Sequence, residues 1–182
     1  PLSTITGILN LCIEDLGDDN LDEVRLNLLK AVEISARSAQ KVEGVLRIAR
    51  AGRDEIPVTT VLLEPVIQEI WLDLTGGGSP IQLQLDLNYT NPIRTELPTL
   101  KVIIENIISN AVRYMDDKKP DHIVRITSED VENGFKISIS DNGIGIPEKN
   151  IPKIFQMFKR LDDRSGDGLG LALVQKQVDR LG

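Results

Sequence analysis

The chain has 182 residues, 41% of them apolar, 27% charged and only 3% aromatic, so we expect an aliphatic core large enough to need no disulfide or metal. The net charge of −7 argues against nucleic acid or an anionic membrane surface as the main partner. One cysteine excludes an internal disulfide, and no apolar run approaches the length of a membrane span.

Residues 1–51 predict two helices, one over about 1–16 and one over about 21–51. Apolar and small residues recur along both helices at alternating spacings of three and four, the pattern of a coiled-coil seam. Two such helices cannot bury their seams and flanks alone, so we expect a four-helix bundle formed by two copies. The alternative is an intramolecular hairpin that the second half of the chain covers.

The periodicity changes at residues 52–57, where we place a boundary between domains 1–52 and 57–182. The second domain predicts helices separated by strands, and the strands 122–128 and 134–140 are expected to pair through a turn at 133–134. The fold class is therefore α+β, with helices on one face of a mixed sheet in a two-layer sandwich. The other predicted elements are strands 61–63 and 81–87 and helices 65–74, 98–116 and 169–181.

The helix 98–116 combines a broad apolar arc with two asparagines. Asn106 and Asn110 are four residues apart, so they share one edge of the arc, with Arg113 near them. Asparagine is a poor residue for a helix interior, and two of them at the rim of a buried face indicate a pocket that needs amide groups. A solvated pair on a surface helix is the alternative. The arc consists of Leu100, Ile103, Ile104, Ile107, Ile108, Ala111 and Met115.

The strand 134–140 ends in SDNGIGIP. Asp141 keeps the parity of the apolar face, so we expect an inward carboxylate that needs a donor, such as the exocyclic amine of adenine. Gly143 and Gly145 would let the main chain approach a ligand. The alternative is an Asx turn that ends the strand.

The last helix follows three glycines, Gly166, Gly168 and Gly170. A glycine-rich turn at a helix N-terminus favours anions, because its free N–H groups and dipole attract phosphate. The segment before it contains Phe155 and Phe158, which we expect to anchor it. Lys159 and Arg160 could reach phosphates, or could be a solvated basic pair.

Four motifs, NIISNAVRY, SDNGIGIP, IFQMF and GDGLGLAL, resemble the N box, first glycine box, F box and second glycine box of sensor histidine kinases, in the family's order. The likeness covers essentially the whole chain. Residues 1–52 resemble the dimerisation and histidine-phosphotransfer hairpin. Residues 57–182 resemble the Bergerat-type (GHKL) ATP-binding domain shared with gyrase, heat-shock chaperone and mismatch-repair ATPases.

The resemblance implies an ATP site with Mg²⁺. Asn110 would coordinate the metal, with Asn106 supporting metal and phosphates, while Arg113 stands where the family usually has lysine. Residues from about 147 to 168 would form the ATP lid. The other residues implied in ATP binding are Tyr114, Asp141, Gly143, Gly145, Ile146, Lys159, Arg160, Gly166, Gly168, Leu169 and Gly170.

The implied function is a cytoplasmic histidine kinase core of a two-component system, as part of a larger membrane-anchored or soluble sensor. It would be a homodimer through residues 1–51 and would pass phosphate from ATP to a histidine and then to a response-regulator aspartate. The family's H-[DE]-x-x-x-P pattern puts that histidine five residues before Pro1, so we expect no autophosphorylation by these residues alone. The only histidine, His122, reads as a surface residue, and two further strands are expected after the last helix.

Two other functions remain open: a degenerate kinase that acts as a nucleotide-binding dimerisation module, and a hydrolytic ATPase of the wider family. Hydrolytic relatives carry a glutamate four residues before the metal asparagine, where this chain has Asn106. Glu105 lies about 140° around the helix from Asn110, which is a poor position for a base. The substitution favours phosphoryl transfer to a protein side chain over hydrolysis.

Overall fold

The computed structural model describes residues 2–17, 20–50, 55–132, 134–159 and 168–181. The chain divides into two compact units, Pro1–Arg47 and Ile48–Gly182. The predicted boundary at 52–57 falls partly outside the described residues and stays a prediction. Within the described ranges, no helix combines the length and the hydropathy that crossing a membrane requires.

The first unit is the predicted helical hairpin, made by α1 (Leu2–Gly17) and the first part of α2 (Leu21–Arg50). Cys12 and Val24 are buried between the helices, with the thiol Sγ 3.8 Å from the Val24 carbonyl oxygen. The Asn27 side chain, also buried, donates from Nδ2 to Asp15 Oδ2 over 3.1 Å, which ties the helices together near their turn. The helix pair therefore has apolar and polar contacts of its own.

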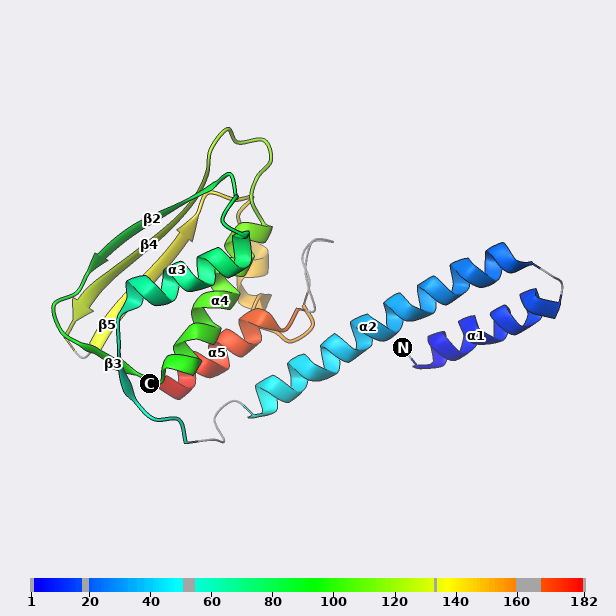
Figure 1. The fold of residues 1–182 in the computed structure, drawn as a ribbon. Helices are drawn as coiled ribbons and strands as arrows, with labels where there is room; N and C mark the ends of the chain where they lie inside the picture. The colour runs from blue at the N-terminus through cyan, green and yellow to red at the C-terminus, as the bar shows by residue number, and fades with distance from the viewer. Residues whose placement is uncertain (1, 18–19, 51–54, 133, 160–167, 182) are drawn as a thin grey trace. The chain divides into compact units, whose positions relative to one another are not determined.

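The second unit is a two-layer sandwich, as predicted. Its main sheet has the order β2-β4-β5, with β2 parallel to β4 and β4 antiparallel to β5, and a second antiparallel pair is formed by β1 and β3. Figure 1 shows α3 and α4 on the same face of the main sheet. The bounds are β1 Thr59–Val61, α3 Leu63–Thr75, β2 Ile81–Asn88, β3 Ile93–Thr95, α4 Leu97–Arg113, β4 His122–Val131, β5 Gly134–Asp141, the 3-10 helix η1 Glu148–Lys153, and α5 Gly170–Leu181.

The core lies between this sheet and the helices. Val124 and Ile126 of β4 are fully buried, as are Ile67 of α3 and Ile108 of α4, and Ile104 is 1% exposed. Alternate residues of a strand point to opposite faces, so β4 covers the helices with one face and leaves polar side chains on the other. This packing holds α4 with its asparagine edge half-buried at the rim of the core.

Several elements differ from the predicted ones. The strand β3 is absent from the prediction because three residues carry no detectable period. The helix α4 ends at Arg113 rather than at residue 116, since Tyr114 leaves the helical conformation with φ −104° and ψ 25°. Its carbonyl oxygen accepts a hydrogen bond from a distant turn, the N–H of Ile144, over 3.0 Å. A long-range contact therefore sets the end of α4.

Candidate active site

The C-terminal end of α4 meets the turn that follows β5. Besides the Ile144 contact, the Gly143 N–H donates to Asp141 Oδ1 over 2.8 Å. A methyl group on Gly143 would collide with the main-chain oxygen of Tyr114. Glycine is therefore required here for the turn to pack against the helix end, and the glycine motif serves this approach in addition to any ligand.

Asp141 keeps the parity of the core-facing residues, because it pairs with the fully buried Val124 of β4, but it is exposed at the end of the strand. Phe135, Ile137 and Ile139 pack against the core on this same face, and β5 ends at Asp141, where the chain turns. The hydrogen bond from Gly143 makes this an Asx turn, the alternative that the sequence left open. The same bond orients the carboxylate at the end of the strand.

Two residues that the sequence did not single out hold this turn in place. Asn142 accepts from the Ile123 N–H over 2.9 Å through Oδ1 and donates to the Asp121 carbonyl over 2.7 Å through Nδ2. Lys119 Nζ donates to the main-chain oxygens of Asn142 and Gly143 at 2.6 and 3.3 Å. The Asp-Asn-Gly sequence is typical of a turn and could have suggested Asn142, whereas nothing in the sequence marks Lys119.

A second contact joins α4 to the start of α5. Asn106 Nδ2 donates to the Val102 carbonyl over 2.7 Å, so its Oδ1 is turned away from its own helix. A Cβ on Gly170 would lie 2.8 Å from that Oδ1. The amide oxygen of Asn106 therefore faces the first residue of α5, and Asn110 lies half-buried one helical turn further along α4.

A main-chain hydrogen bond also joins Phe158 to Gly168, which lie on either side of residues 160–167 in the sequence. The Phe158 N–H donates to the Gly168 carbonyl over 2.9 Å, and Gly168 has φ +73°, a left-handed conformation that favours glycine. Leu169 is 2% exposed and packs against Leu173 and Val102, and its carbonyl oxygen accepts from the Leu173 N–H over 2.9 Å.

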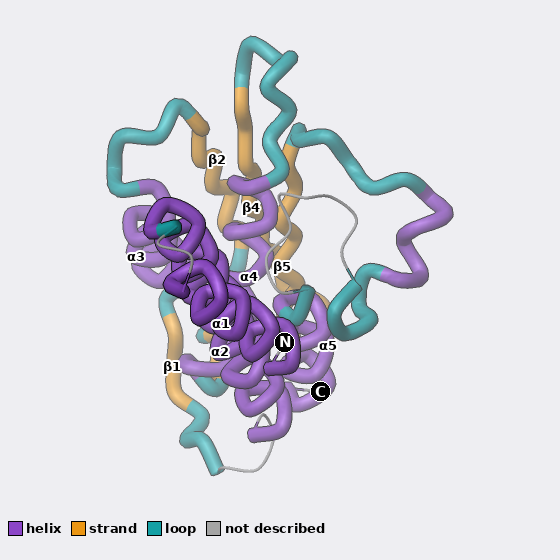
Figure 2. The backbone as a smooth tube through the Cα atoms, turned by 90° about the vertical axis from the view of Figure 1, so that its right-hand side faces the viewer, coloured by secondary structure: helices purple, strands orange, loops and turns teal. Residues whose placement is uncertain are grey.

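The expected anchoring by Phe155 and Phe158 is wrong, because these side chains are 42% and 50% exposed. In Figure 2 the stretch between β5 and residue 159 is mostly loop, with η1 as its short helix. Short irregular segments bury little apolar surface, so an aromatic residue in one is not evidence of a core contact.

The predicted residues thus form two groups along α4, one around Asn106 and one around Tyr114, about 12 Å apart at 1.5 Å per residue. Arg113 and Lys159 are exposed, as are Gly145, which has φ +72°, and Ile146. Arg160 and Gly166 lie outside the described residues. Glu105 is exposed, and His122 is half-buried with Nε2 3.2 Å from the Asp116 carbonyl oxygen.

No cluster of three or more His, Cys, Asp or Glu side chains in the described ranges could hold a metal ion. The candidate donors are instead the amide oxygens of Asn106 and Asn110. Mg²⁺ prefers oxygen ligands and often takes only one or two from the protein when substrate phosphates supply others. The asparagine edge of α4 fits a metal that arrives with a phosphate ligand.

Comparison with known proteins places this arrangement in a family. Residues 95–182, which run from the end of β3 through α5, match the model of the histidine kinase-, DNA gyrase B- and HSP90-like ATPases. This range contains both contact groups of α4, the turn after β5 and the glycines that precede α5.

Curated relatives include a histidine kinase and two sensor proteins. The chain is 26% identical to the methanogenesis regulatory histidine kinase FilI of Methanothrix harundinacea, over 98% of this chain and 20% of that protein. It is 26% identical to the phosphate regulon sensor protein PhoR of Pseudomonas aeruginosa, over 99% of this chain and 42% of that protein. It is 31% identical to the sensor protein RprX of Bacteroides fragilis, over 96% of this chain and 31% of that protein. The chain therefore spans less than half of each relative.

Solved structures share the fold. Full-length ShkA in complex with AMPPNP has a TM-score of 0.66 at 22% identity, covering 87% of this chain and 34% of that one. The histidine kinase AdeS of Acinetobacter baumannii has a TM-score of 0.59 at 20% identity, covering 99% of this chain and 86% of that one. Residues 95–182 therefore belong to the histidine kinase-, DNA gyrase B- and HSP90-like ATPases, as the catalytic ATP-binding domain of a sensor histidine kinase.

Proposed function

We propose that this domain binds Mg-ATP along α4, between the turn after β5 and the start of α5. The observation that carries the proposal is that two groups of residues lie along α4, each suited to one end of a nucleotide. Asn106 Oδ1 faces Gly170 near one end, and the Asp141 turn packs on Tyr114 at the other. Their separation of about 12 Å along the helix suits a base and a triphosphate at opposite ends.

At the turn after β5, Asp141 is the acceptor for the adenine amino group. Its Oδ1 is engaged by Gly143, so Oδ2 is the oxygen we assign to the base. The exposed main chain around Gly145 and Ile146 then lies against the adenine ring, where the absence of a side chain on Gly145 permits a close approach. Tyr114 lines the same end of the site.

At the other end, Asn110 supplies an oxygen to Mg²⁺, and Asn106 supports the metal and the phosphates. Magnesium contributes neutralisation of the phosphate charge when it is bound. The cationic side chains of Lys159 and Arg160 contact phosphate oxygens, and Arg113, next to Tyr114 in the chain, extends toward the phosphates from the base end of α4. The main chain of Gly166, Gly168, Leu169 and Gly170 gives N–H groups to them at the start of α5.

The reaction that we propose is transfer of the γ-phosphate to a histidine on the dimerisation helix, followed by transfer to a response-regulator aspartate. The acceptor histidine lies outside residues 1–182, since the ring of His122 is held at the start of β4 by Asp116. Residues 1–52 act as the dimerisation hairpin of a homodimer, and residues 57–182 act as the kinase domain. The site of action is the cytoplasm.

Transfer is favoured over hydrolysis by the α4 sequence. The position four residues before Asn110 holds the amide of Asn106, which cannot deprotonate water, and Glu105 is exposed. We therefore expect steady-state phosphate release without a protein acceptor to be slow. Robust release would favour the hydrolytic alternative.

The proposal is tested by calorimetric titration of the 182-residue chain with Mg-ADP and Mg-AMPPNP. We expect binding of both, and a loss of about tenfold or more in D141N, because a neutral amide offers a weaker acceptor to the adenine amine. The matched control is D86N, which changes an exposed carboxylate on β2 and should leave affinity unchanged. Absence of binding by the unmodified chain, or equal affinity in D141N, would overturn the assignment.

A further inference from the structure

The helices α4 and α5 run antiparallel along a seam that ends at the candidate site. At one end, Arg180 of α5 contacts Glu96, which precedes α4. At the other end, Gly170 lies so near Asn106 that a Cβ added to it would be 2.8 Å from Asn106 Oδ1. Figure 1 shows the two helices side by side, so a single rigid helix connects a distant ion pair to the phosphate end of the proposed site.

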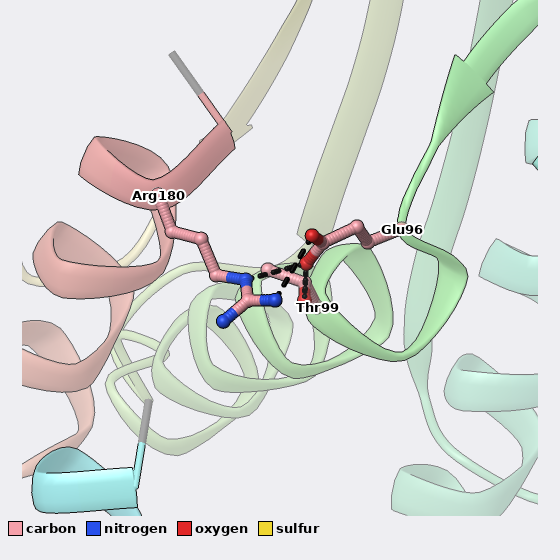
Figure 3. Close-up of polar contacts among 3 residues, drawn as sticks. All are labelled: Glu96, Thr99 and Arg180. Carbon is pink, nitrogen blue, oxygen red and sulfur yellow. Dashed lines mark hydrogen bonds and ion pairs between the residues drawn. The ribbon is translucent and has the colours of Figure 1, made fainter. Parts of the chain in front are cut away.

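The distant end is a bidentate ion pair. Arg180 Nε donates to Glu96 Oε2 over 2.6 Å, and Nη2 donates to Oε1 over 3.0 Å (Figure 3). The Thr99 hydroxyl donates to the same Oε2 over 2.7 Å. The two charged side chains are only 13% and 15% exposed, so solvent screens this pair weakly. The Arg180 and Thr99 hydrogen bonds lower the pKa of Glu96, which keeps its carboxylate charged.

The middle of the seam is apolar. Leu173 and Ala172 of α5 pack with Leu169 and against Val102 of α4. Gln177 also lies on α5, and its buried Oε1 has no hydrogen-bond partner among the described residues. Apolar contacts are non-directional, so this region does little to fix how far α5 is displaced along α4. The bidentate fork of Arg180 is directional and can do so.

We propose that Glu96 and Arg180 are positioning residues that set the axial register of α5 and thereby place Gly170 opposite Asn106. Ten residues of helix separate Arg180 from Gly170, about 15 Å, and a helix of this length transmits a shift of one end to the other. Gly170 has little tolerance for such a shift, because even a Cβ there would lie 2.8 Å from Asn106 Oδ1. The consequence for nucleotide affinity rests on the function proposed above.

The test uses E96Q, which keeps the side-chain shape and removes the charge. We expect the amide resonance of Gly170 and the side-chain NH₂ resonances of Asn106 to move in two-dimensional NMR spectra, while those of Gly143 stay in place. The affinity for Mg-ADP should fall by about tenfold, the size typical of mutations that act through a packed element, while adenosine affinity is unchanged. R180K keeps the positive charge but cannot make the two parallel hydrogen bonds of arginine. It should shift the same resonances in the same direction as E96Q, by a smaller amount.

The matched control is E69Q, which breaks the exposed pair between Glu69 of α3 and Lys101 of α4. It removes an ion pair from the same helix on a different side and should leave the Gly170 and Asn106 resonances and the affinity unchanged. A folded E96Q or R180K with unmoved Gly170 and Asn106 resonances would overturn the positioning role. If the unmodified chain binds no nucleotide, the proposed function fails, yet the resonances still decide whether Glu96 and Arg180 position α5.

Discussion

Gly143 illustrates how one residue type can answer a structural need at a candidate site. The sequence indicated only that a glycine there would let the main chain approach something. The structure identifies a protein neighbour, the Tyr114 carbonyl group at the end of α4. The same turn carries Asp141, so packing of the turn and orientation of the carboxylate are coupled through two adjacent hydrogen bonds.

Replacing Gly143 by alanine should lower the free energy of unfolding by about 1–3 kcal/mol, because the added methyl overlaps the Tyr114 carbonyl oxygen in a packed contact. Urea denaturation at neutral pH measures the change. The matched control is G78A, where a Cβ meets nothing within 4 Å, and its midpoint should stay close to that of the unmodified protein. Equal midpoints for the two variants would contradict the close approach.

Asp130 gives a second test at the scale of single residues. Its Oδ2 accepts from the Thr90 hydroxyl over 2.5 Å and the Thr90 N–H over 2.8 Å, and these bonds lower its pKa below the ordinary 3.8. A carboxylate with a lowered folded pKa stabilises the fold above its unfolded pKa, and this contribution is lost as the pH falls through the folded value.

Chemical denaturation should therefore show that the unmodified protein loses more stability than D130N as the pH drops below about 4, because the amide cannot be protonated there. At neutral pH the variant should be the less stable of the two. The other carboxylates are common to both proteins, so the difference between the curves isolates Asp130. Parallel curves would show that the Thr90 bonds contribute no pH dependence.

The helical hairpin shows what an element can and cannot bury alone. The helix α1 has 16 residues and α2 has 30, so much of α2 has no length of α1 to pack against. Three residues of the predicted heptad seam are exposed: Leu28 by 45%, Val42 by 60% and Val45 by 39%. Exposed apolar side chains along one seam of a helix are typical of an interface, and they support the proposed homodimer.

V42E should shift the protein from dimer to monomer in light scattering coupled to size exclusion, since a charge on the seam opposes burial by a second copy. The matched control is V58E, which adds the same charge at a valine 52% exposed outside the hairpin. The control should leave the mass unchanged. A monomeric unmodified protein, or a dimeric V42E, would argue against the seam as the interface.

At the scale of the whole molecule, the proposed phosphotransfer needs an acceptor that these 182 residues do not supply. His122 is engaged with the Asp116 carbonyl group at the start of β4. A protein in which a histidine stands five residues before Pro1 should therefore label itself with radioactive phosphate from ATP, whereas residues 1–182 should not. The label should be lost in acid and retained in base, as expected of a phosphorylated histidine. An acid-stable product would contradict histidine as the acceptor.

The sequence alone determined the family, the fold class and the order of the main elements. These depend on local patterns: the spacing of apolar residues fixes which face of a helix or strand is buried, and the four motifs are contiguous strings. The comparisons confirmed the family, and the structure confirmed the hairpin and the sandwich. The apolar arc of α4 was predicted for the same reason, with Ile104 and Ile108 at its buried centre.

Only the tertiary structure decided the contacts between residues far apart in the chain. The end of α4 at Arg113, the exposure of Asp141 and the hold of Lys119 on its turn follow from the packing of β5 against the helix end. The Glu96–Arg180 pair joins residues that 84 positions separate. Periodicity reports which face of an element is buried but not which neighbour covers it, so the partners of these side chains, and the register of α5 on α4, required the three-dimensional arrangement.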